Sequence, residues 1–293
     1  MLEGSGMMSG KDAFESSARP FAFDYRLRSD RPFDGYYHSH LAAELLYVHR
    51  GRGKVVVRER TYELKAGTLF FFQPDQLHRV HAEIDAEAPY ERTILHFMPP
   101  VLEEHLRAFP ELHRFFMQLW QGRLVRQAFE LGERGELLEQ LLRYFADRIG
   151  GTAGWQSEEG TLFFAQLVQL IRTMAEQSAP EGGAVPGGSA RHSEQIMKWI
   201  NARYQEKFDL EEMAGALHLS KFHLSRVFRS ETGSSITEYL IARRLKEACR
   251  LLRATALPIE MIGMEVGIGN ASYFSQLFRK QIGVTPHEYR MRK

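Results

Sequence analysis

The chain repeats one of its own segments at a distance of fifty residues. Seven positions recur in the same order: Leu224, Ser225, Val227, Phe228, Arg229, Gly233 and Tyr239 match Phe274, Ser275, Leu277, Phe278, Arg279, Gly283 and Tyr289. Each copy has apolar residues at helical spacing and ends at a glycine, as helices often do. A solenoid needs at least three stacked repeats. Two copies, each preceded by another short helical pattern, therefore predict a pair of helix-turn-helix units.

The first unit is predicted to consist of helices over residues 210–217 and 221–231, with Ser220 as the N-cap of the second. Its buried face would contain Leu210, Met213, Ala214, Leu217, Leu224, Val227 and Phe228. The opposite face of the second helix then carries Phe222, Ser225, Arg226 and Arg229, which lie at i, i+3, i+4 and i+7.

The second unit is predicted over residues 259–266 and 271–281, with Asn270 as the cap of its second helix. The buried face would contain Ile259, Ile262, Val266, Phe274, Leu277 and Phe278, with Gly263 where the two helices cross closely. The outer face carries Ser272, Ser275, Gln276 and Arg279. Further helices are predicted over residues 193–206, 235–253 and 286–291, so this part of the chain is entirely helical.

Charge is distributed unevenly along the 293 residues, although the net charge is only +1. Residues 191–293 contain 17 Lys and Arg against 11 Asp and Glu, whereas the remainder contains 21 against 26. A basic C-terminal third beside an acidic remainder fits contact with nucleic acid at one end only.

The helical third resembles the AraC/XylS family of bacterial transcription regulators over residues 193–292. The resemblance rests on Leu219–Gly233, Arg243–Ala248, Ile259–Gly267, Ser272–Lys280 and Gly283–Arg290, all in the family's order. Two packing positions depart from the family pattern: Gly263 stands where the family usually has alanine, and Ile268 where it usually has phenylalanine. The resemblance implies a seven-helix domain in which helix 235–253 holds the two units in successive major grooves of double-stranded DNA.

Carried over by position, the resemblance implies base contacts by Phe222, Ser225 and Arg226 in the first unit and by Ser272 and Gln276 in the second. Asn270 and Tyr273 would lie near the rim of the second unit. The chemistry agrees, since Arg pairs with guanine and Gln with adenine. Phosphate contacts are expected from Lys221, Arg229, Arg279 and Lys280.

The N-terminal part reads as a separate domain. Residues 180–190 are dominated by Gly, Pro and Ser and predict a flexible linker. Residues 1–19 are expected to be a flexible leader.

Strand patterns at Glu44–Val48, Lys54–Val57 and Thr68–Phe72 predict a small antiparallel barrel or sandwich. Residues 101–178 are expected to be helical, covering the barrel or forming a dimer seam. The fold class is thus α+β, with a sensor over residues 20–179 and a DNA-binding domain over 191–293.

The strand region also resembles a cupin domain over residues 25–98. His38, His40 and Glu44 have the layout of the first cupin motif, and His78 stands where the second supplies its histidine, without the usual preceding glycine. The four side chains are candidates to line a pocket for an organic ligand or to bind a divalent transition metal, the only cofactor expected. His96, Arg92 and Tyr47 are further candidates, whereas His49 and His81 are expected at the surface.

Two functions remain open at this point. The first is a transcription regulator, an activator by resemblance, that binds DNA as a homodimer, contacts RNA polymerase and responds to a small molecule such as a sugar. The second is a metal-dependent cupin enzyme, an isomerase or dioxygenase, with a DNA-binding tail. A non-enzymatic role is favoured because no nucleophile with its base and no phosphate-binding glycine loop occurs. A single cysteine, Cys249, and no apolar membrane segment favour the cytoplasm.

Overall fold

The computed structural model describes residues 21–30, 35–84, 89–121, 127–149, 157–177 and 192–291. The expected leader at residues 1–19 and the expected linker at 180–190 lie outside this set. Among the described helices, none is both long and apolar enough to cross a membrane.

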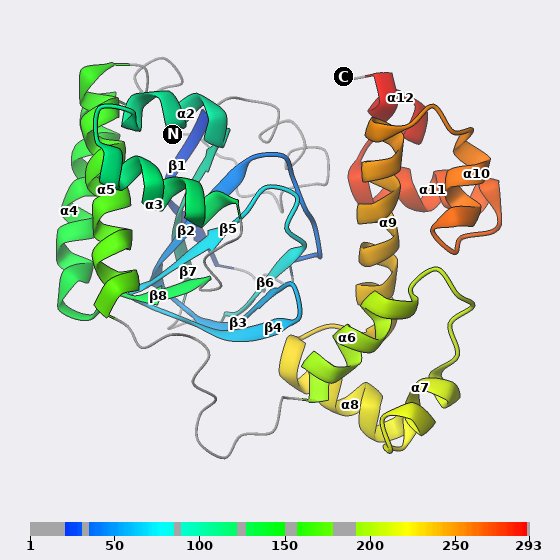
Figure 1. Ribbon diagram of the computed structural model, residues 1–293. Helices are drawn as coiled ribbons and strands as arrows, with labels where there is room; N and C mark the ends of the chain where they lie inside the picture. The colour runs from blue at the N-terminus through cyan, green and yellow to red at the C-terminus, as the bar shows by residue number, and fades with distance from the viewer. Residues whose placement is uncertain are drawn as a thin grey trace.

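Two antiparallel sheets form the N-terminal domain (Figure 1). The larger sheet contains, in spatial order, β1 (Phe21–Ser29), β7 (Tyr90–Phe97), β2 (Ala43–Arg50), β5 (Thr68–Phe72) and β8 (Ala128–Glu130). The smaller sheet contains β4 (Arg60–Lys65), β3 (Arg52–Val57) and β6 (His78–Glu83). The three strands predicted from sequence are confirmed as parts of β2, β3 and β5.

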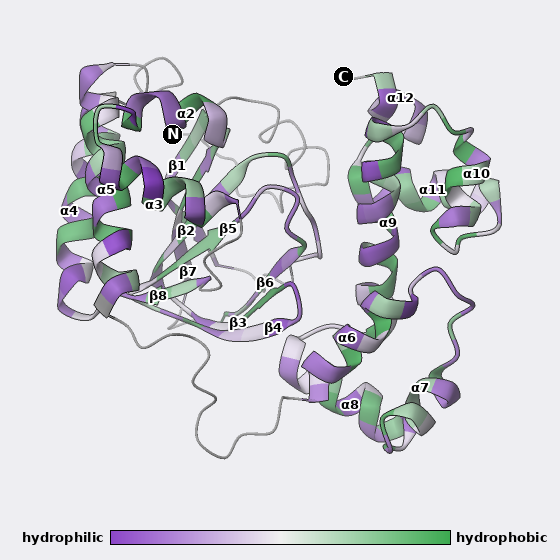
Figure 2. Cartoon of the chain, viewed as in Figure 1, coloured by the Kyte–Doolittle hydropathy of each residue, from purple (hydrophilic) through white to green (hydrophobic). Residues whose placement is uncertain are grey.

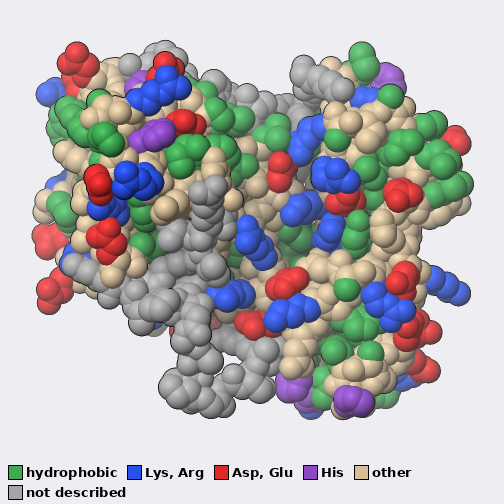
Figure 3. Space-filling model, viewed as in Figure 1, with side chains coloured by type: hydrophobic (Ala, Val, Ile, Leu, Met, Phe, Trp, Pro, Cys, Tyr) green, Lys and Arg blue, Asp and Glu red, His purple; other side chains and the backbone are tan. Residues whose placement is uncertain are grey.

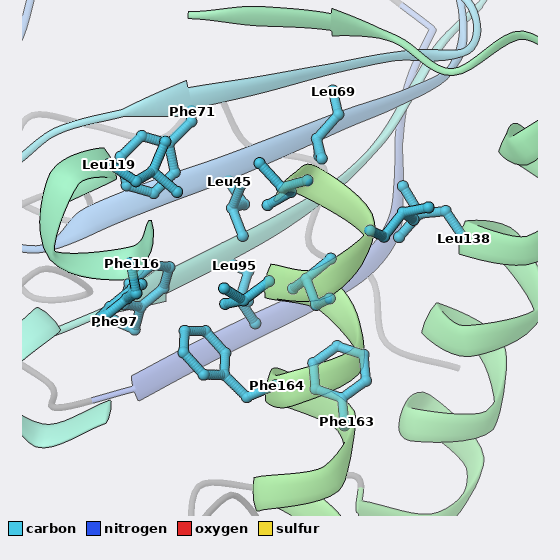
Figure 4. Packing of buried hydrophobic residues seen from close by; sticks show 14 of the residues in the cluster. Leu45, Leu69, Phe71, Leu95, Phe97, Phe116, Leu119, Leu138, Phe163 and Phe164 are labelled. Carbon is cyan, nitrogen blue, oxygen red and sulfur yellow. The ribbon is translucent and has the colours of Figure 1, made fainter. Parts of the chain in front are cut away.

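The larger sheet is buried on both faces, which explains why β2 and β5 are almost continuously apolar. Successive side chains of a strand point to opposite faces. Leu45 and Phe71 pack against the helices, whereas Leu46 and Phe70 pack in the core shared with the smaller sheet. Figure 4 shows the helix-facing core, with Phe116, Phe163 and Phe164 against the sheet residues.

The helices that cover this face are α2 (Pro99–Leu106), α3 (Pro110–Trp120), α4 (Gly135–Ile149) and α5 (Glu158–Gln177). The expectation that residues 101–178 are all helical is wrong at β8. Its Phe129 pairs with Leu69 on β5 and is 1% exposed, so burial of this side chain fixes a short strand at the sheet edge.

The C-terminal domain contains seven helices within residues 192–291, as predicted: α6 (His192–Arg203), α7 (Leu210–Ala216), α8 (Lys221–Thr232), α9 (Ile236–Ala254), α10 (Ile259–Glu265), α11 (Ala271–Ile282) and α12 (Pro286–Met291). The long helix α9 joins the two helix-turn-helix units, which lie at its opposite ends (Figure 1). Its 19 residues span about 28 Å at 1.5 Å per residue. The α+β architecture expected from the sequence is confirmed.

Local capping explains where the two repeated helices begin and end. The Ser220 hydroxyl accepts a hydrogen bond from the His223 amide, and the Asn270 side chain accepts one from the Tyr273 amide, so both predicted caps are confirmed. Gly233 and Gly283 end the helices in the left-handed conformation, with φ of 76° and 87°. A β-carbon on Gly263 would lie 3.3 Å from the ring of Phe274 on α11, which confirms the close crossing of α10 and α11.

The N-terminal domain contacts the first helix-turn-helix unit directly. Tyr37, Val56 and Leu77 belong to the same buried cluster as Leu224 and Phe228 of α8. Lys and Arg side chains gather along the line where the two domains meet (Figure 3).

Candidate functional site

The outer faces of α8 and α11 are the candidate DNA-binding surface. On α8 the inward residues Leu224 and Phe228 are fully buried, and this leaves the opposite face open. All of the predicted DNA-contacting side chains are exposed: Lys221, Phe222, Ser225, Arg226, Arg229, Asn270, Ser272, Tyr273, Gln276, Arg279 and Lys280. Phe222 is 79% exposed and Tyr273 53%, which is unusual for large aromatic side chains unless a partner covers them.

Two of these side chains already have polar neighbours. Lys221 Nζ lies 2.7 Å from Glu211 Oε1, and Arg226 Nη2 lies 3.4 Å from His223 Nδ1. Exposed pairs of this kind contribute little stability, so either side chain can exchange its neighbour for a phosphate or a base. Asn270, in contrast, uses its side-chain oxygen to cap α11.

The second candidate site is a cluster of imidazoles around one carboxylate inside the N-terminal domain. His38, His40, Glu44 and His78 each offer one ligand atom, and these atoms all lie within 4.8 Å of one another. Glu44 Oε2 lies 2.9 Å from His40 Nε2 and 3.4 Å from His78 Nε2. The structure thus brings together the four residues named from sequence.

The backbone that delivers the two N-terminal histidines differs from the expectation. His38, His40 and Glu44 would all point to one side if they shared a continuous strand, but β2 begins at Ala43. His38 instead forms an isolated antiparallel bridge with His78, and His40 lies in the loop between that bridge and β2.

Backbone carbonyls fix which nitrogen of each ring carries the hydrogen. Nδ1 of His38, His40 and His78 lies 3.0, 2.8 and 2.8 Å from the carbonyl oxygens of Tyr36, Ala42 and Gln76, respectively. A carbonyl only accepts, so each Nδ1–H donates, and in the neutral ring Nε2 keeps its lone pair. Three lone pairs then converge on a carboxylate, and a divalent cation would relieve this arrangement.

Burial decides the protonation of the cluster. It lowers the pKa of His38 well below its usual range and also lowers the pKa of His40. Burial alone would raise the pKa of Glu44, but the charge of His96 and the hydrogen bond from its ring outweigh burial and hold this pKa well below its usual range. A set of three imidazoles and one carboxylate suits Zn²⁺ or a neighbouring transition metal.

Comparison with known proteins assigns both halves. A family model described as an AraC-like ligand binding domain matches residues 25–184, and one described as a helix-turn-helix domain matches residues 213–292. The chain belongs to the AraC family. As a member of this family it is a transcription regulator with a ligand-binding domain and a DNA-binding domain.

Relatives of this AraC-family chain are themselves regulators. It is 27% identical over 256 residues to the uncharacterized HTH-type transcriptional regulator YfiF of Bacillus subtilis. The aligned region covers 86% of this chain and 78% of YfiF. It is 25% identical over 263 residues to the transcriptional activator RhaR of Escherichia coli K12. That aligned region covers 86% of this chain and 86% of RhaR. A solved structure, the C-terminal domain of AraT from Geobacillus stearothermophilus, is 32% identical over 36% of this chain and 87% of that one, with a TM-score of 0.34.

His96 joins the cluster of this AraC-family domain, although the cupin motif does not include it. Glu44 pairs with His96 across β2 and β7, and His96 Nε2 lies 3.1 Å from Glu44 Oε2. Burial alone would lower the pKa of His96, but the charge of Glu44 outweighs it and raises this pKa. Because a carboxylate only accepts, the His96 Nε2–H donates to Glu44 and orients the carboxylate. His96 was a further candidate from the sequence, and the register between β2 and β7 is what brings it to Glu44.

Arg92 and Tyr47 were the other candidates. Arg92 Nη1 donates to the Ser29 hydroxyl at 2.8 Å. Tyr47 is on the helix-facing side of β2, where its hydroxyl donates to Glu139 on α4. His49 was expected at the surface, and this is wrong: it is 8% exposed, and its Nε2 lies 2.7 Å from the Thr93 hydroxyl. It is buried because α4 covers this face of the sheet. His81 is half-buried.

Proposed function

We propose that this chain is a sequence-specific activator of transcription that acts in the cytoplasm, with a sensor at residues 20–179, a linker at 180–190 and a DNA-binding domain at 191–293. The observation that carries the proposal is the pair of matching exposed faces on α8 and α11, held at opposite ends of one helix. Two units joined this way suit successive major grooves of one duplex. The RhaR relatives, named as activators, support activation, which requires contact with RNA polymerase.

The effector that the cluster suits best is a divalent transition metal. His40, Glu44 and His78 are at most 8% exposed, and the Phe72 ring stacks on His78 at 4.1 Å. A sugar would have to reach the cluster past His38, which borders a cavity of about 120 Å³. Sites for small organic ligands usually measure about 300 Å³ or more. These observations favour an ion over the sugar expected from the family resemblance.

Base recognition is tested by replacing Arg226 with Ala. We expect the affinity for the specific operator to fall by about 1–3 kcal/mol and the preference at one base position to relax, because a bidentate contact with guanine is lost. Binding to an operator series with every base at each position measures both effects.

The matched control is Arg229→Ala, one helical turn further along the same face. A phosphate contact carries no sequence information, so this change is expected to weaken all sequences equally and to reduce the salt dependence. If Arg226→Ala behaved in the same way, Arg226 would only contact phosphate.

The helices of the N-terminal domain offer a surface for a second copy of the chain. Leu137 and Tyr144 on α4 and Leu162 on α5 are 58%, 50% and 55% exposed and line one groove together with Leu141. Figure 2 shows hydrophobic segments between hydrophilic ones along both helices. A self-complementary apolar surface suits a two-fold dimer, and a dimer would bind two operator half-sites.

Leu137→Glu is expected to weaken dimerisation by roughly 2 kcal/mol or more, because a charge would be buried in the seam. Sedimentation over a range of concentrations measures this. Leu257→Glu, at a 39% exposed leucine in the DNA-binding domain, is the control and should leave the dimer intact. An unchanged dimer in Leu137→Glu would place the seam elsewhere.

The competing hypothesis is a cupin enzyme in which the same four residues bind a catalytic metal. An enzyme needs substrate at the metal, whereas the deep burial of Glu44 and His78 supports a site that holds an ion alone. Stoichiometric iron or manganese together with no sequence-selective DNA binding would favour the enzyme.

A further inference from the structure

The histidine cluster and the contact between the two domains share the same backbone. Two segments, residues 37–40 and 75–79, run side by side, and we call them the bridge segments. His38 and His78 exchange two backbone hydrogen bonds of 3.0 Å each, and the Asp75 amide donates to the His40 carbonyl at 2.7 Å. Each bridge segment therefore holds the other in place.

Along each bridge segment, side chains point alternately toward the histidine cluster and toward the DNA-binding domain. His38 and His78 point toward Glu44. In extended chain the adjacent side chains point the opposite way, and Tyr37, Leu77 and Arg79 contact the DNA-binding domain. One face of the bridge thus belongs to the cluster and the other to the domain contact.

The contacts on the second face are specific. Tyr37 Oη lies 3.0 Å from the Ser234 hydroxyl, and the Tyr37 ring meets the Tyr239 ring edge-on at 5.1 Å. Arg79 Nη1 donates to the Thr232 carbonyl at 3.0 Å. All three partners lie at the end of α8 or the start of α9, the helix that carries both DNA-binding units.

A further contact extends from the same segments to the far end of α9. Arg253 Nη2 lies 2.7 Å from Asp75 Oδ1. Between the bridge segments and α9 lies the cavity of about 120 Å³, which is bordered by His38 and Lys246. Because this part of the interface is incompletely packed, docking of the two domains depends strongly on the contacts made by the bridge segments.

We propose that a divalent metal ion in the histidine cluster stabilises the docked arrangement of the DNA-binding domain through the bridge segments. The inference rests on the metal effector proposed above. An ion binds only where Nε2 of His38 and His78 converge, and that convergence requires the bridge that positions Tyr37 and Arg79. A ligand shifts an equilibrium only toward the state that it binds better, and the docked state is the one with the assembled cluster.

Coupling is reciprocal: docking strengthens ion binding by the same factor by which the ion strengthens docking. A variant that shifts the chain toward the undocked state must therefore bind the ion more weakly. The test is titration of the full chain with Co²⁺, followed by its visible absorption, in the wild type and in the variants Arg79→Ala and Ser234→Ala. Neither residue is a ligand, and Ser234 belongs to the other domain. We expect the Co²⁺ affinity to fall about tenfold in each variant.

Hydrogen exchange supplies a second readout. Saturation with Co²⁺ should slow amide exchange over residues 229–240 in the wild type and much less in the variants. Phe222→Ala is the control, because this 79% exposed side chain lies on the face of α8 that is turned away from the N-terminal domain. The Co²⁺ affinity and the amide exchange over residues 229–240 should both be unaltered in this variant. Protection of Leu224 and Phe228 amides verifies that each variant remains folded.

The outcomes separate the two proposals. Co²⁺ binding that is equal in wild type and variants, with no change at residues 229–240, overturns the coupling and leaves the metal effector standing. A wild-type chain that does not bind Co²⁺ contradicts the metal effector itself and the coupling with it.

Discussion

Replacing Phe228 with Ala is expected to destabilise the first helix-turn-helix unit by about 3–5 kcal/mol, the usual loss when a fully buried aromatic ring leaves a cavity. Phe228 is 0% exposed, and its ring meets Tyr239 of α9 at 6.0 Å. Such a loss is a large part of the stability of a domain. Urea unfolding monitored by amide exchange in α6 to α9 measures it, and specific DNA binding should be lost with the fold.

Phe222→Ala is the matched control on the same helix. Phe222 is 79% exposed, so its removal should change the unfolding free energy by no more than about 0.5 kcal/mol. Its effect should appear only in operator affinity. Equal destabilisation by the two substitutions would show that the faces of α8 are assigned incorrectly.

Replacing Glu44 with Gln is expected to weaken Co²⁺ binding by at least about 100-fold. Loss of a side chain that merely orients a ligand typically costs about 10–100-fold, and Glu44 is the one carboxylate among the four residues of the cluster. Gln has nearly the same size, so the fold should persist. Co²⁺ titration and metal content after purification measure the effect.

Glu139→Gln removes a carboxylate from the other side of the sheet and serves as the control. Its side chain is 40% exposed and accepts from the Tyr47 hydroxyl. Co²⁺ affinity should be unchanged in this variant. An unchanged affinity in Glu44→Gln as well would mean that the ion binds elsewhere or that the cluster does not bind one.

The C-terminal domain could be predicted almost residue by residue, and the reason is local. Its helices are amphipathic and bounded by local signals, such as Ser220 before α8 and Gly233 after it. These signals act within a few residues. Exposure of Arg226 and Gln276 followed from helical spacing alone.

The N-terminal domain was harder to predict because its pattern depends on tertiary burial. Strands β2 and β5 are buried on both faces, so alternation of polar and apolar residues is missing. The same burial explains the error at His49. The four cluster residues followed from the cupin motif, but His96 depends on the pairing of β2 with β7. The contact between the two domains depends on pairs such as Tyr37 and Ser234, which are far apart in the sequence.

Because α9 is long, a small movement at the bridge segments would displace the second helix-turn-helix unit by a large distance. The bridge segments contact α9 near the first unit through Tyr37 and near the second unit through the Asp75–Arg253 ion pair. Over a length of about 28 Å, a tilt of about ten degrees displaces the far end by about 5 Å, more than the rise of about 3.4 Å between successive base pairs. The helix acts as a lever arm, so slight loosening at the sensor would put the second unit out of register with its half of the operator.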